Sequence, residues 1–412
     1  MNELRQKAVT VAIDTGEYDV LTSLLELEEL CDTAGADVVA SFTQNRESAD
    51  KATFIGSGKL YEIKDYIEEN GADILVFDSE LSGSQIRNIE EIVDIRVIDR
   101  TMLILDIFAG RAKSSEGKLQ VELAQQKYRL PRLTGMGKSL SRLGGGIGTR
   151  GPGETKLETD KRHIRRRINA LEEELRDMEE RRARVRERRK KQSVITIAIV
   201  GYTNVGKSTL LNLLTDAGVY AKNQLFATLD PTARELVLPD GQHAVIVDTV
   251  GLIRRLPHQL VEAFKSTLEE AAAADVILNV CDASNENLKE QLEVTKNLLS
   301  ELGCGDTPVI TVYNKADLLD EIPENTGERA VFTSAKDDIG IERLLNLISE
   351  VLSGSMHKVT LLIPYDKGYL LSKIREQGKV FSEEFTENGT LVDALIEKKI
   401  LKLISPYITT SE

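Results

Sequence analysis

Residues 194–214 read VITIAIVGYTNVGKSTLLNLL, and this stretch decides the fold of the second half of the chain. An unbroken apolar run over residues 194–200 predicts a buried strand, and residues 209–214 continue as a helix. The intervening loop, GYTNVGKS, matches G-x-x-x-x-G-K-[ST]. The N–H groups of such a loop surround phosphate oxygens. Lys207 would contact the β- and γ-phosphates, and the Ser208 hydroxyl would bind Mg²⁺. The stretch predicts a P-loop nucleotide site in an α/β fold.

Two later motifs extend the phosphate site. The apolar run at residues 244–247 ends in D-x-x-G, which would place Asp248 near Mg²⁺ through a water and the Gly251 N–H at the γ-phosphate. Between the P-loop and this motif lies FATLD, residues 226–230, where a threonine is expected to reach Mg²⁺ and the γ-phosphate. We favour Thr228 for this role, with Thr232 as the competitor.

Base selectivity is predicted from N-K-x-D, which follows an expected strand at residues 309–313. The Asp317 carboxylate can accept from both N1–H and the N2 amine of guanine, whereas adenine would leave it unpaired. The Lys315 stem can pack over the base, and Asn314 can brace the loop or reach N7. Further along, S-A-K would place the Ala335 N–H at guanine O6. The ordered set of motifs is typical of a GTPase.

The complete predicted site follows from these motifs. Lys207, Thr228 and Gly251 are assigned to catalysis, and Ser208, Thr228 and, through a water, Asp248 to magnesium. GTP contacts are predicted for Gly201, Tyr202, Thr203, Asn204, Val205, Gly206, Lys207, Ser208, Thr209, Phe226, Ala227, Thr228, Leu229, Asp230, Asp248, Thr249, Val250, Gly251, Asn314, Lys315, Ala316, Asp317, Ser334, Ala335 and Lys336.

The residue after Gly251 is Leu252. Ras-like enzymes have a glutamine there that orients the attacking water, and a leucine cannot do so. Intrinsic hydrolysis is therefore expected to be slow, with the water placed by the backbone, by another group or by a partner.

Two similar sequences fail the P-loop test. Around Gly58-Lys59, a threonine and a leucine stand where the first glycine and the hydroxyl residue belong. Before residues 137–139, GKS, an arginine stands at the first glycine position and no strand precedes it. We interpret both as loops that bind no nucleotide.

The ends of the chain show strand–helix alternation. Strands are predicted at residues 8–13, 37–42, 74–77 and 95–98, and helices at 20–33, 60–70 and 84–93. This alternation predicts a small N-terminal α/β domain with parallel strands. A strand at 359–363 and a helix at 369–377 predict a small C-terminal α/β domain. The predicted domains are 1–104 (N-terminal α/β), 105–191 (helical hairpin), 192–355 (GTP-binding) and 356–412 (C-terminal α/β).

The region between the two α/β segments carries a heptad-like apolar seam. Two such helices joined by one loop are expected to close as an antiparallel hairpin. A second helix of about 34 residues would be about 50 Å long. The seam residues are Leu119, Leu123 and Leu130 in the first helix, then Leu157, Ile164, Ile168, Leu171, Leu175, Met178 and Val185 in the second.

The loop at the tip of this hairpin is expected to bind a polyanion. Residues 134–154 hold eight glycines. Residues 111–191 hold 24 Lys or Arg against 12 Asp or Glu, a net of +12 in a chain of net charge −14. A Gly-rich linker and a solvated, salt-bridged helix pair are the alternatives. The predicted RNA contacts are Arg142, Gly144, Gly145, Gly146, Arg150, Gly151 and Pro152.

Composition excludes several classes. Apolar residues make up 41% and charged residues 29%, typical of a globular protein. No apolar run approaches the ~18–20 residues of a membrane span. Cys31, Cys281 and Cys304 lack metal-ligand spacing, so buried free thiols in a reducing cytoplasm are expected. The four histidines are dispersed and indicate neither a zinc site nor a histidine-led mechanism.

With these residues in view, the chain resembles the HflX family of translational GTPases over nearly its whole length. Besides the nucleotide motifs, the resemblance rests on FIGSGKL (54–60), FDSELSGSQIRN (77–88), GKLQVELAQ (117–125), GGGIGTRGPGETKLETDKR (144–162) and LFATLDPTAR (225–234). It implies an N-terminal α/β domain with a helical hairpin, then a GTP-binding domain and often a C-terminal domain.

The same resemblance implies a function. Members bind the large ribosomal subunit and split stalled or hibernating ribosomes under stress, with residues 144–154 approaching the peptidyl-transferase region. Members tend to have Phe where this chain has Leu252, so the missing glutamine is shared.

Three functions fit these observations. The first is a Mg²⁺-dependent GTPase that acts on the large ribosomal subunit and its RNA. The second is a GTP-regulated protein that binds or remodels free structured RNA, and the third is a signalling GTPase whose hairpin binds an acidic protein or a membrane face. The hairpin lacks an apolar outer face and has only Tyr128 as a nearby aromatic, which argues against membrane insertion and base stacking. We expect a cytoplasmic monomer with no DNA partner and no membrane association.

Overall fold

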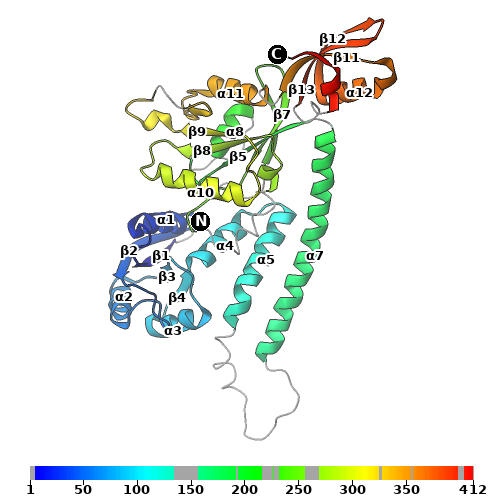
Figure 1. Ribbon diagram of the computed structural model, residues 1–412. Helices are drawn as coiled ribbons and strands as arrows, with labels where there is room; N and C mark the ends of the chain where they lie inside the picture. The colour runs from blue at the N-terminus through cyan, green and yellow to red at the C-terminus, as the bar shows by residue number, and fades with distance from the viewer. Residues whose placement is uncertain are drawn as a thin grey trace. The chain divides into compact units, whose positions relative to one another are not determined.

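A computed structural model describes residues 5–133, 156–191, 194–215, 226, 232–255, 269–323, 327–353, 356–397 and 403–411. The chain divides into two compact units (Figure 1). Unit 1 contains residues 1–180, 221–230 and 250–267, and unit 2 contains residues 181–220, 231–249 and 268–412.

Unit 1 is built around a four-stranded sheet of order β2-β1-β3-β4, in which every pairing is parallel. The central strand β3 reads ILVF and is buried along its whole length, as expected for a strand covered on both faces. The elements are β1 Gln6–Asp14, α1 Val20–Thr33, β2 Ala36–Asn45, α2 Ser57–Asn70, β3 Ile74–Phe77, α3 Gly83–Val93, β4 Arg96–Asp99 and α4 Arg100–Arg111.

Helices α2 and α3 cover one face of this sheet. Leu60, Ile63 and Ile89 of these helices pack with Leu75 and Phe77 of β3 in one buried cluster. Local capping fixes where the helices begin: Asp19 accepts the N–H groups of residues 21 and 22 at the start of α1, and Ser82 forms a capping box with residue 85 at the start of α3. The parallel α/β fold predicted for this region is confirmed, with α1 and β3 matching to the residue. The prediction of a loop at Gly58-Lys59 is wrong, because both residues lie in the first turn of α2.

Two long helices follow, α5 (Ser115–Arg132) and α7 (Lys156–Lys191). Figure 1 shows that the part of α7 in unit 1 runs beside α5 in the opposite direction. Arg167 of α7 forms an ion pair with Glu122 of α5 at 2.6 Å, and Lys127 of α5 pairs with Glu172 of α7 at 3.0 Å. The tip segment between the helices, which contains the predicted RNA contacts, lies outside the described residues.

The apolar seam differs from the predicted one. The buried residues of α5 are Gly117, Val121, Ala124 and Tyr128, rather than the leucines at 119, 123 and 130, which are half-buried. The buried face of α5 includes Tyr128, which donates a 2.5 Å hydrogen bond to Asp99 at the end of β4. In α7 the seam is fully buried at residues 168 and 171, whereas Val185 is exposed. Helix α5 has 18 residues and α7 has 36, so α5 cannot cover the second half of its partner.

Unit 2 contains a six-stranded sheet of order β10-β9-β8-β5-β7-β6, parallel except for the edge pairing of β6 with β7. Strand β5 lies between β7 and β8, so the direction in which successive strands are added reverses at β5. Open α/β sheets bind ligands at the carboxyl ends of strands at such a point. The elements are β5 Ile195–Gly201, α8 Lys207–Thr215, β6 Thr232–Val237, β7 His243–Asp248, β8 Val276–Asp282, α10 Leu288–Glu301, β9 Val309–Asn314, η3 Ala316–Leu318, β10 Ala330–Phe332 and α11 Ile341–Ser353.

The C-terminal part of unit 2 forms a separate four-stranded sheet of order β12-β13-β11-β14, and its pairings are antiparallel. Leu370 and Ile374 of its helix pack on Leu361, Val392 and Ala394 of the sheet. The elements are β11 Met356–Ile363, η4 Tyr365–Lys367, α12 Gly368–Gln377, β12 Gly378–Thr386, β13 Gly389–Glu397, η5 Ser405–Tyr407 and β14 Ile408–Ser411. A search of the described residues finds no helix that is long and apolar enough to span a membrane.

Candidate nucleotide-binding site

The P-loop joins the carboxyl end of β5 to the N-terminus of α8, as the sequence predicted. Two of its residues must be glycine. Gly201 has φ +145° and Gly206 has φ +93°, both in the left-handed half of the backbone map. A Cβ at Gly201 would collide with the Val280 carbonyl of the neighbouring strand, and one at Gly206 would collide with the Asn314 amide. The loop is therefore packed directly against β8 and against the N-K-x-D segment.

Lys207 is the first residue of α8, and its side chain is buried beneath the loop. Its Nζ donates hydrogen bonds to the carbonyl oxygens of Gly201 at 3.1 Å and Tyr202 at 2.5 Å. Burial lowers the pKa of Lys207 to about 8, and the negative charge of Asp248 acts in the opposite direction. The ammonium group thus lies at the centre of the curled loop, where phosphate oxygens are expected.

Ser208 and Asp248 meet at the base of the site. The Ser208 Oγ donates to Asp248 Oδ2 at 2.8 Å, and Asp248 is fully buried at the end of β7. Thr249 holds the next position of this strand to β5 through its hydroxyl, which donates to the Ile199 carbonyl at 2.7 Å. The competing switch threonine, Thr232, begins the edge strand β6 and is the ladder partner of Asp248. Thr228 and its neighbours at 227, 229 and 230 lie outside the described residues, so their roles stay predictions.

Asn314 braces the site, which was one of the two roles predicted for it. Its Nδ2 donates to the Val205 carbonyl of the P-loop at 2.8 Å. Its Oδ1 accepts from the Ala335 N–H at 3.1 Å and from the Thr333 hydroxyl at 3.3 Å. One buried amide therefore joins the P-loop, the N-K-x-D segment and the S-A-K segment. The Ala335 N–H, predicted to contact guanine O6, is hydrogen-bonded to Asn314 here.

Asp317 is oriented by a residue of the S-A-K segment. The Ser334 hydroxyl donates to Asp317 Oδ1 at 2.6 Å, and this hydrogen bond holds the pKa of Asp317 below its ordinary value. The carboxylate is therefore ionised at neutral pH and can accept from two N–H donors of a base. Sequence reasoning assigned Ser334 only as a contact residue and missed this orienting role.

Lys315 and a residue missed by the sequence analysis form a second pair at the base-binding edge. Lys315 has a left-handed backbone, φ +62°, and its Nζ pairs with Asp282 Oδ2 at 2.7 Å. Asp282 ends β8, the neighbour of β9 in the sheet. This ion pair orients the aliphatic stem of Lys315, the part predicted to pack over the base. The only signal in the sequence was a carboxylate at the end of an apolar strand, VILNVCD.

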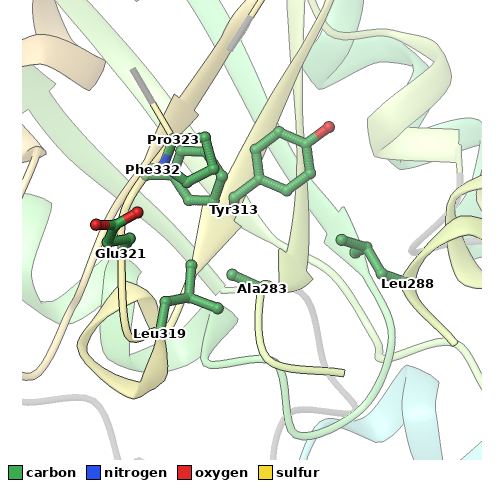
Figure 2. A pocket seen from close by; sticks show the side chains of 7 residues that line it. All are labelled: Ala283, Leu288, Tyr313, Leu319, Glu321, Pro323 and Phe332. Atoms are coloured by element: carbon green, nitrogen blue, oxygen red, sulfur yellow. The ribbon is translucent and has the colours of Figure 1, made fainter. Parts of the chain in front are cut away.

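A pocket of about 400 Å³ lies beside Tyr313 of β9 and Phe332 of β10 (Figure 2). The Tyr313 and Phe332 rings stack in its wall with centroids 4.8 Å apart. Ala283, Leu288, Leu319, Glu321 and Pro323 complete the lining. None of these residues was predicted to bind nucleotide.

Some predicted residues belong to the other unit. Phe226 and the segment Val250, Gly251 and Leu252 are part of unit 1. Phe226 is buried, and its ring packs edge-on against Phe108 of α4 at 4.7 Å between centroids. The predicted thiols behave as expected: all three cysteines are buried and free. Burial raises the pKa of Cys31 and of Cys281 to about 12.

Known proteins match this chain along its length. Family models match in chain order: "GTP-binding GTPase N-terminal" at residues 22–109, "GTP-binding GTPase Middle Region" at 111–189, "50S ribosome-binding GTPase" at 196–315 and "HflX C-terminal domain" at 321–399. The GTPase HflX of Caldanaerobacter subterraneus subsp. tengcongensis is 52% identical over 404 residues, which cover 98% of this chain and 94% of that protein. The chain belongs to the HflX family of GTPases.

A second relative that is named as an HflX GTPase also matches most of the chain. The GTPase HflX of Escherichia coli is 42% identical over 392 residues, covering 94% of this chain and 92% of that protein. Among solved structures, a GTP-binding protein from Sulfolobus solfataricus in complex with GDP is 25% identical, with a TM-score of 0.46 over 85% of this chain and 99% of that one. The HflX membership and the GTPase motifs together make this chain a GTP-hydrolysing enzyme.

Proposed function

We propose that this HflX-family GTPase binds the large ribosomal subunit and dissociates stalled or hibernating ribosomes, in a Mg²⁺-dependent cycle of GTP binding and hydrolysis. The observation that carries the proposal is the presence, in one chain, of a guanine-reading P-loop site and a basic two-helix hairpin. The family model over residues 196–315 is described as a 50S ribosome-binding GTPase, which supports this partner. Such an enzyme would work in the cytoplasm as part of a stress response.

The residues at the base of the P-loop fit a magnesium ion. Ser208 Oγ and Asp248 Oδ2 are 2.8 Å apart, and hydroxyl and carboxylate oxygens are ligands that Mg²⁺ accepts. When bound, the ion would neutralise charge on the β- and γ-phosphates. Ser208 would bind it directly and Asp248 through a water, while Lys207 would contact the same phosphates from the other side.

Hydrolysis in this site depends on more than the nucleotide motifs. Leu252 cannot orient a water, so we propose that binding to the ribosome completes the catalytic arrangement. The γ-phosphate would order the Thr228 and Gly251 segments, and its loss would release them. The GTP-bound form would then hold the ribosomal subunit, and hydrolysis would release it.

The hairpin supplies the surface for ribosomal RNA. Arg165 and Arg166 are exposed in the first part of α7, whereas Arg167 is paired with Glu122 and serves the hairpin itself. Exposed arginines gain affinity for RNA by releasing counterions from phosphates, and this contact reads the shape of folded RNA rather than its base sequence. The predicted contacts at the tip, Arg142 and Arg150, extend this surface and remain predictions from the sequence.

Sucrose-gradient sedimentation tests the proposal. With a non-hydrolysable GTP analogue, we expect the protein to migrate with the large subunit while the fraction of assembled ribosomes falls. The double variant Arg142→Gln/Arg150→Gln should weaken ribosome-stimulated hydrolysis and leave GTP affinity intact, and Arg5→Gln serves as the control for loss of an exposed arginine. Binding to free structured RNA without binding to subunits would instead indicate an RNA-remodelling protein. An equal loss of GTP affinity in the double variant would contradict the separate roles of the two regions.

A further inference from the structure

Asp282 is the last residue of β8 and belongs to none of the nucleotide motifs. In the parallel pairing of β8 with β9 it lies opposite Asn314, so the sheet places it next to the N-K-x-D segment. A backbone hydrogen bond of 2.8 Å from the Ala283 N–H to the Asn314 carbonyl continues this pairing by one residue. The position of Asp282 relative to the base-binding residues is therefore set by backbone pairing within one sheet.

Both carboxylate oxygens of Asp282 have a partner. Oδ1 accepts from the Ser284 N–H at 3.0 Å and from the Ser284 hydroxyl at 2.7 Å, which makes an Asx turn. Oδ2 accepts from Lys315 Nζ at 2.7 Å. The Asp282 side chain is 15% exposed and the Lys315 side chain 29%, so water screens this ion pair less than a pair on the open surface. The turn fixes the carboxylate, and the carboxylate fixes the ammonium group.

Lys315 needs such a partner because its backbone is in an unfavourable conformation. It is the N-cap residue of η3, its φ is +62°, and its side chain makes no capping hydrogen bond. A left-handed conformation of a residue with a side chain persists where surrounding contacts impose it. The next residue supplies one such contact, because the Ala316 N–H donates to the Thr333 carbonyl at 3.0 Å. The lysine side chain is long and flexible, and Asp282 fixes its far end.

The charge of Lys315 also acts on Asp317, the carboxylate expected to read the base. The Ser334 hydroxyl lowers the pKa of Asp317 most, and the positive charges of Lys336 and Lys315 add to this effect. One ammonium group therefore lies between two carboxylates. If it paired with Asp317, it would occupy an acceptor that should face the N1–H and N2 amine of guanine. The ion pair with Asp282 keeps the ammonium group away from this competitor.

We propose that Asp282 is a positioning residue for guanine nucleotides: it holds the Lys315 stem where it can cover the purine ring, and it holds the Lys315 ammonium group away from Asp317. All three residues belong to the same unit. A site that is arranged before the ligand arrives loses less conformational entropy on binding. Such a gain appears mostly as slower dissociation. Asp282 then controls how long GDP stays bound, without itself contacting the nucleotide.

Three variants of the full-length chain and one control test this role. Asp282→Asn keeps an oxygen that can accept from Ser284, but it removes the charge that pairs with Lys315. Lys315→Met keeps an unbranched apolar stem and removes the ammonium group. The third variant combines the two substitutions. Glu383→Gln is the matched control, because Glu383 pairs with Arg375 at 2.6 Å in the C-terminal sheet and is 21% exposed, against 15% for Asp282.

Stopped-flow fluorescence with a labelled GDP measures association and dissociation separately. We expect Asp282→Asn to raise the dissociation rate about tenfold and to leave the association rate within about twofold of the parent. Glu383→Gln should change neither rate. Both substitutions should lower the melting temperature by similar small amounts, because each removes one partly exposed ion pair. An unchanged dissociation rate in Asp282→Asn would overturn the proposal.

The double variant separates positioning from a general contribution to the structure. If Asp282 acts through the Lys315 ammonium group, Asp282→Asn should have no further effect once Lys315 is replaced by methionine. The dissociation rate of the double variant should then lie within about twofold of that of Lys315→Met alone. A merely structural aspartate would raise the rate by the same factor in both backgrounds, and that result would contradict the positioning role.

Inorganic pyrophosphate provides a second readout, because it can occupy the P-loop and carries no base. Titration calorimetry in the presence of Mg²⁺ should give Asp282→Asn a pyrophosphate affinity within about twofold of the parent, since the substitution acts at the base-binding edge. A loss of pyrophosphate affinity as large as the loss of GDP affinity would place the effect at the phosphates. The assignment of Asp282 to base binding would then be wrong.

Discussion

Replacing Asp317 by asparagine should change which purine nucleotide the protein prefers. Ser334 donates to Oδ1 of Asp317 at 2.6 Å, and this hydrogen bond should persist with an asparagine carbonyl. The side-chain Nδ2 would then occupy the position of Oδ2 and present a donor to the base. Guanine offers N1–H and an N2 amine there, so two donors would face each other. Xanthine has a carbonyl at C2, and this oxygen would accept a hydrogen bond from the asparagine Nδ2.

The magnitude follows from the two contacts that change. Loss of a hydrogen bond to a charged acceptor costs about 1.5–3 kcal/mol, and the donor left unsatisfied adds about 1–3 kcal/mol. A total of about 2.5–6 kcal/mol corresponds to a rise of roughly 10²- to 10⁴-fold in the dissociation constant for GDP. Affinity for xanthosine diphosphate should increase in the same variant.

Equilibrium titration with fluorescent GDP and xanthosine diphosphate would measure both effects. Asp320→Asn makes the same chemical change three residues further on, at an exposed position, and should alter neither affinity. Ser334→Ala should weaken GDP binding by roughly tenfold, because Asp317 would lose the hydrogen bond that orients it. Unchanged guanine selectivity in Asp317→Asn would remove this carboxylate from base recognition.

Three further predictions concern the P-loop and the hairpin. Because burial lowers the pKa of Lys207 to about 8 and the phosphates need its charged form, GDP affinity measured from pH 6 to 9 should be constant at first and fall above pH 8. In the unfolded chain the pKa of this lysine is about 10.5, so between pH 8 and 10.5 the unfolded state binds more protons than the folded state. The free energy of unfolding of the nucleotide-free protein should therefore increase as the pH rises through this range. Gly206→Ala should lower the free energy of unfolding by about 1–3 kcal/mol and weaken GDP binding at least tenfold. The new Cβ would collide with the Asn314 amide, and alanine would also be strained at the φ of +93° that Gly206 adopts. Gly110→Ala, where a Cβ meets nothing, is the control in urea melts. Tyr128→Phe should cost about 1–2 kcal/mol in the same melts because it removes the hydrogen bond to Asp99, whereas the exposed Tyr61→Phe should cost nothing measurable.

The sequence predicted the α/β elements well where local signals agree. Helix α1 begins at residue 20 because Asp19 caps it, and β3 is an unbroken apolar run. The nucleotide motifs were also predictable, because each needs a fixed spacing next to a strand end. Asp248 and Ser208, 40 residues apart in the chain, lie within hydrogen-bonding distance, as the order of the motifs implied.

Other features depend on contacts between distant segments, and no local pattern encodes them. The buried face of α5 includes Tyr128, whose hydroxyl bonds to an aspartate 29 residues earlier, so the leucine spacing pointed to the wrong face. The pairing of Lys315 with Asp282 joins two strand ends that only the sheet order brings together. The ion pair between Arg255 and Asp78 spans 177 residues, and neither residue belongs to a nucleotide motif.

The unit boundary between Thr249 and Val250 has a practical consequence for experiments on fragments. A truncated protein that consists of residues 192–355 would retain every nucleotide motif. It would nevertheless lack Asp78, Arg100 and Glu26, so its loop after D-x-x-G would lose the partners that hold residues 254 and 255. Turnover measured on such a fragment would therefore belong to a chain whose loop has lost these contacts, and it should be compared with the turnover of the intact chain before either rate is assigned to the enzyme.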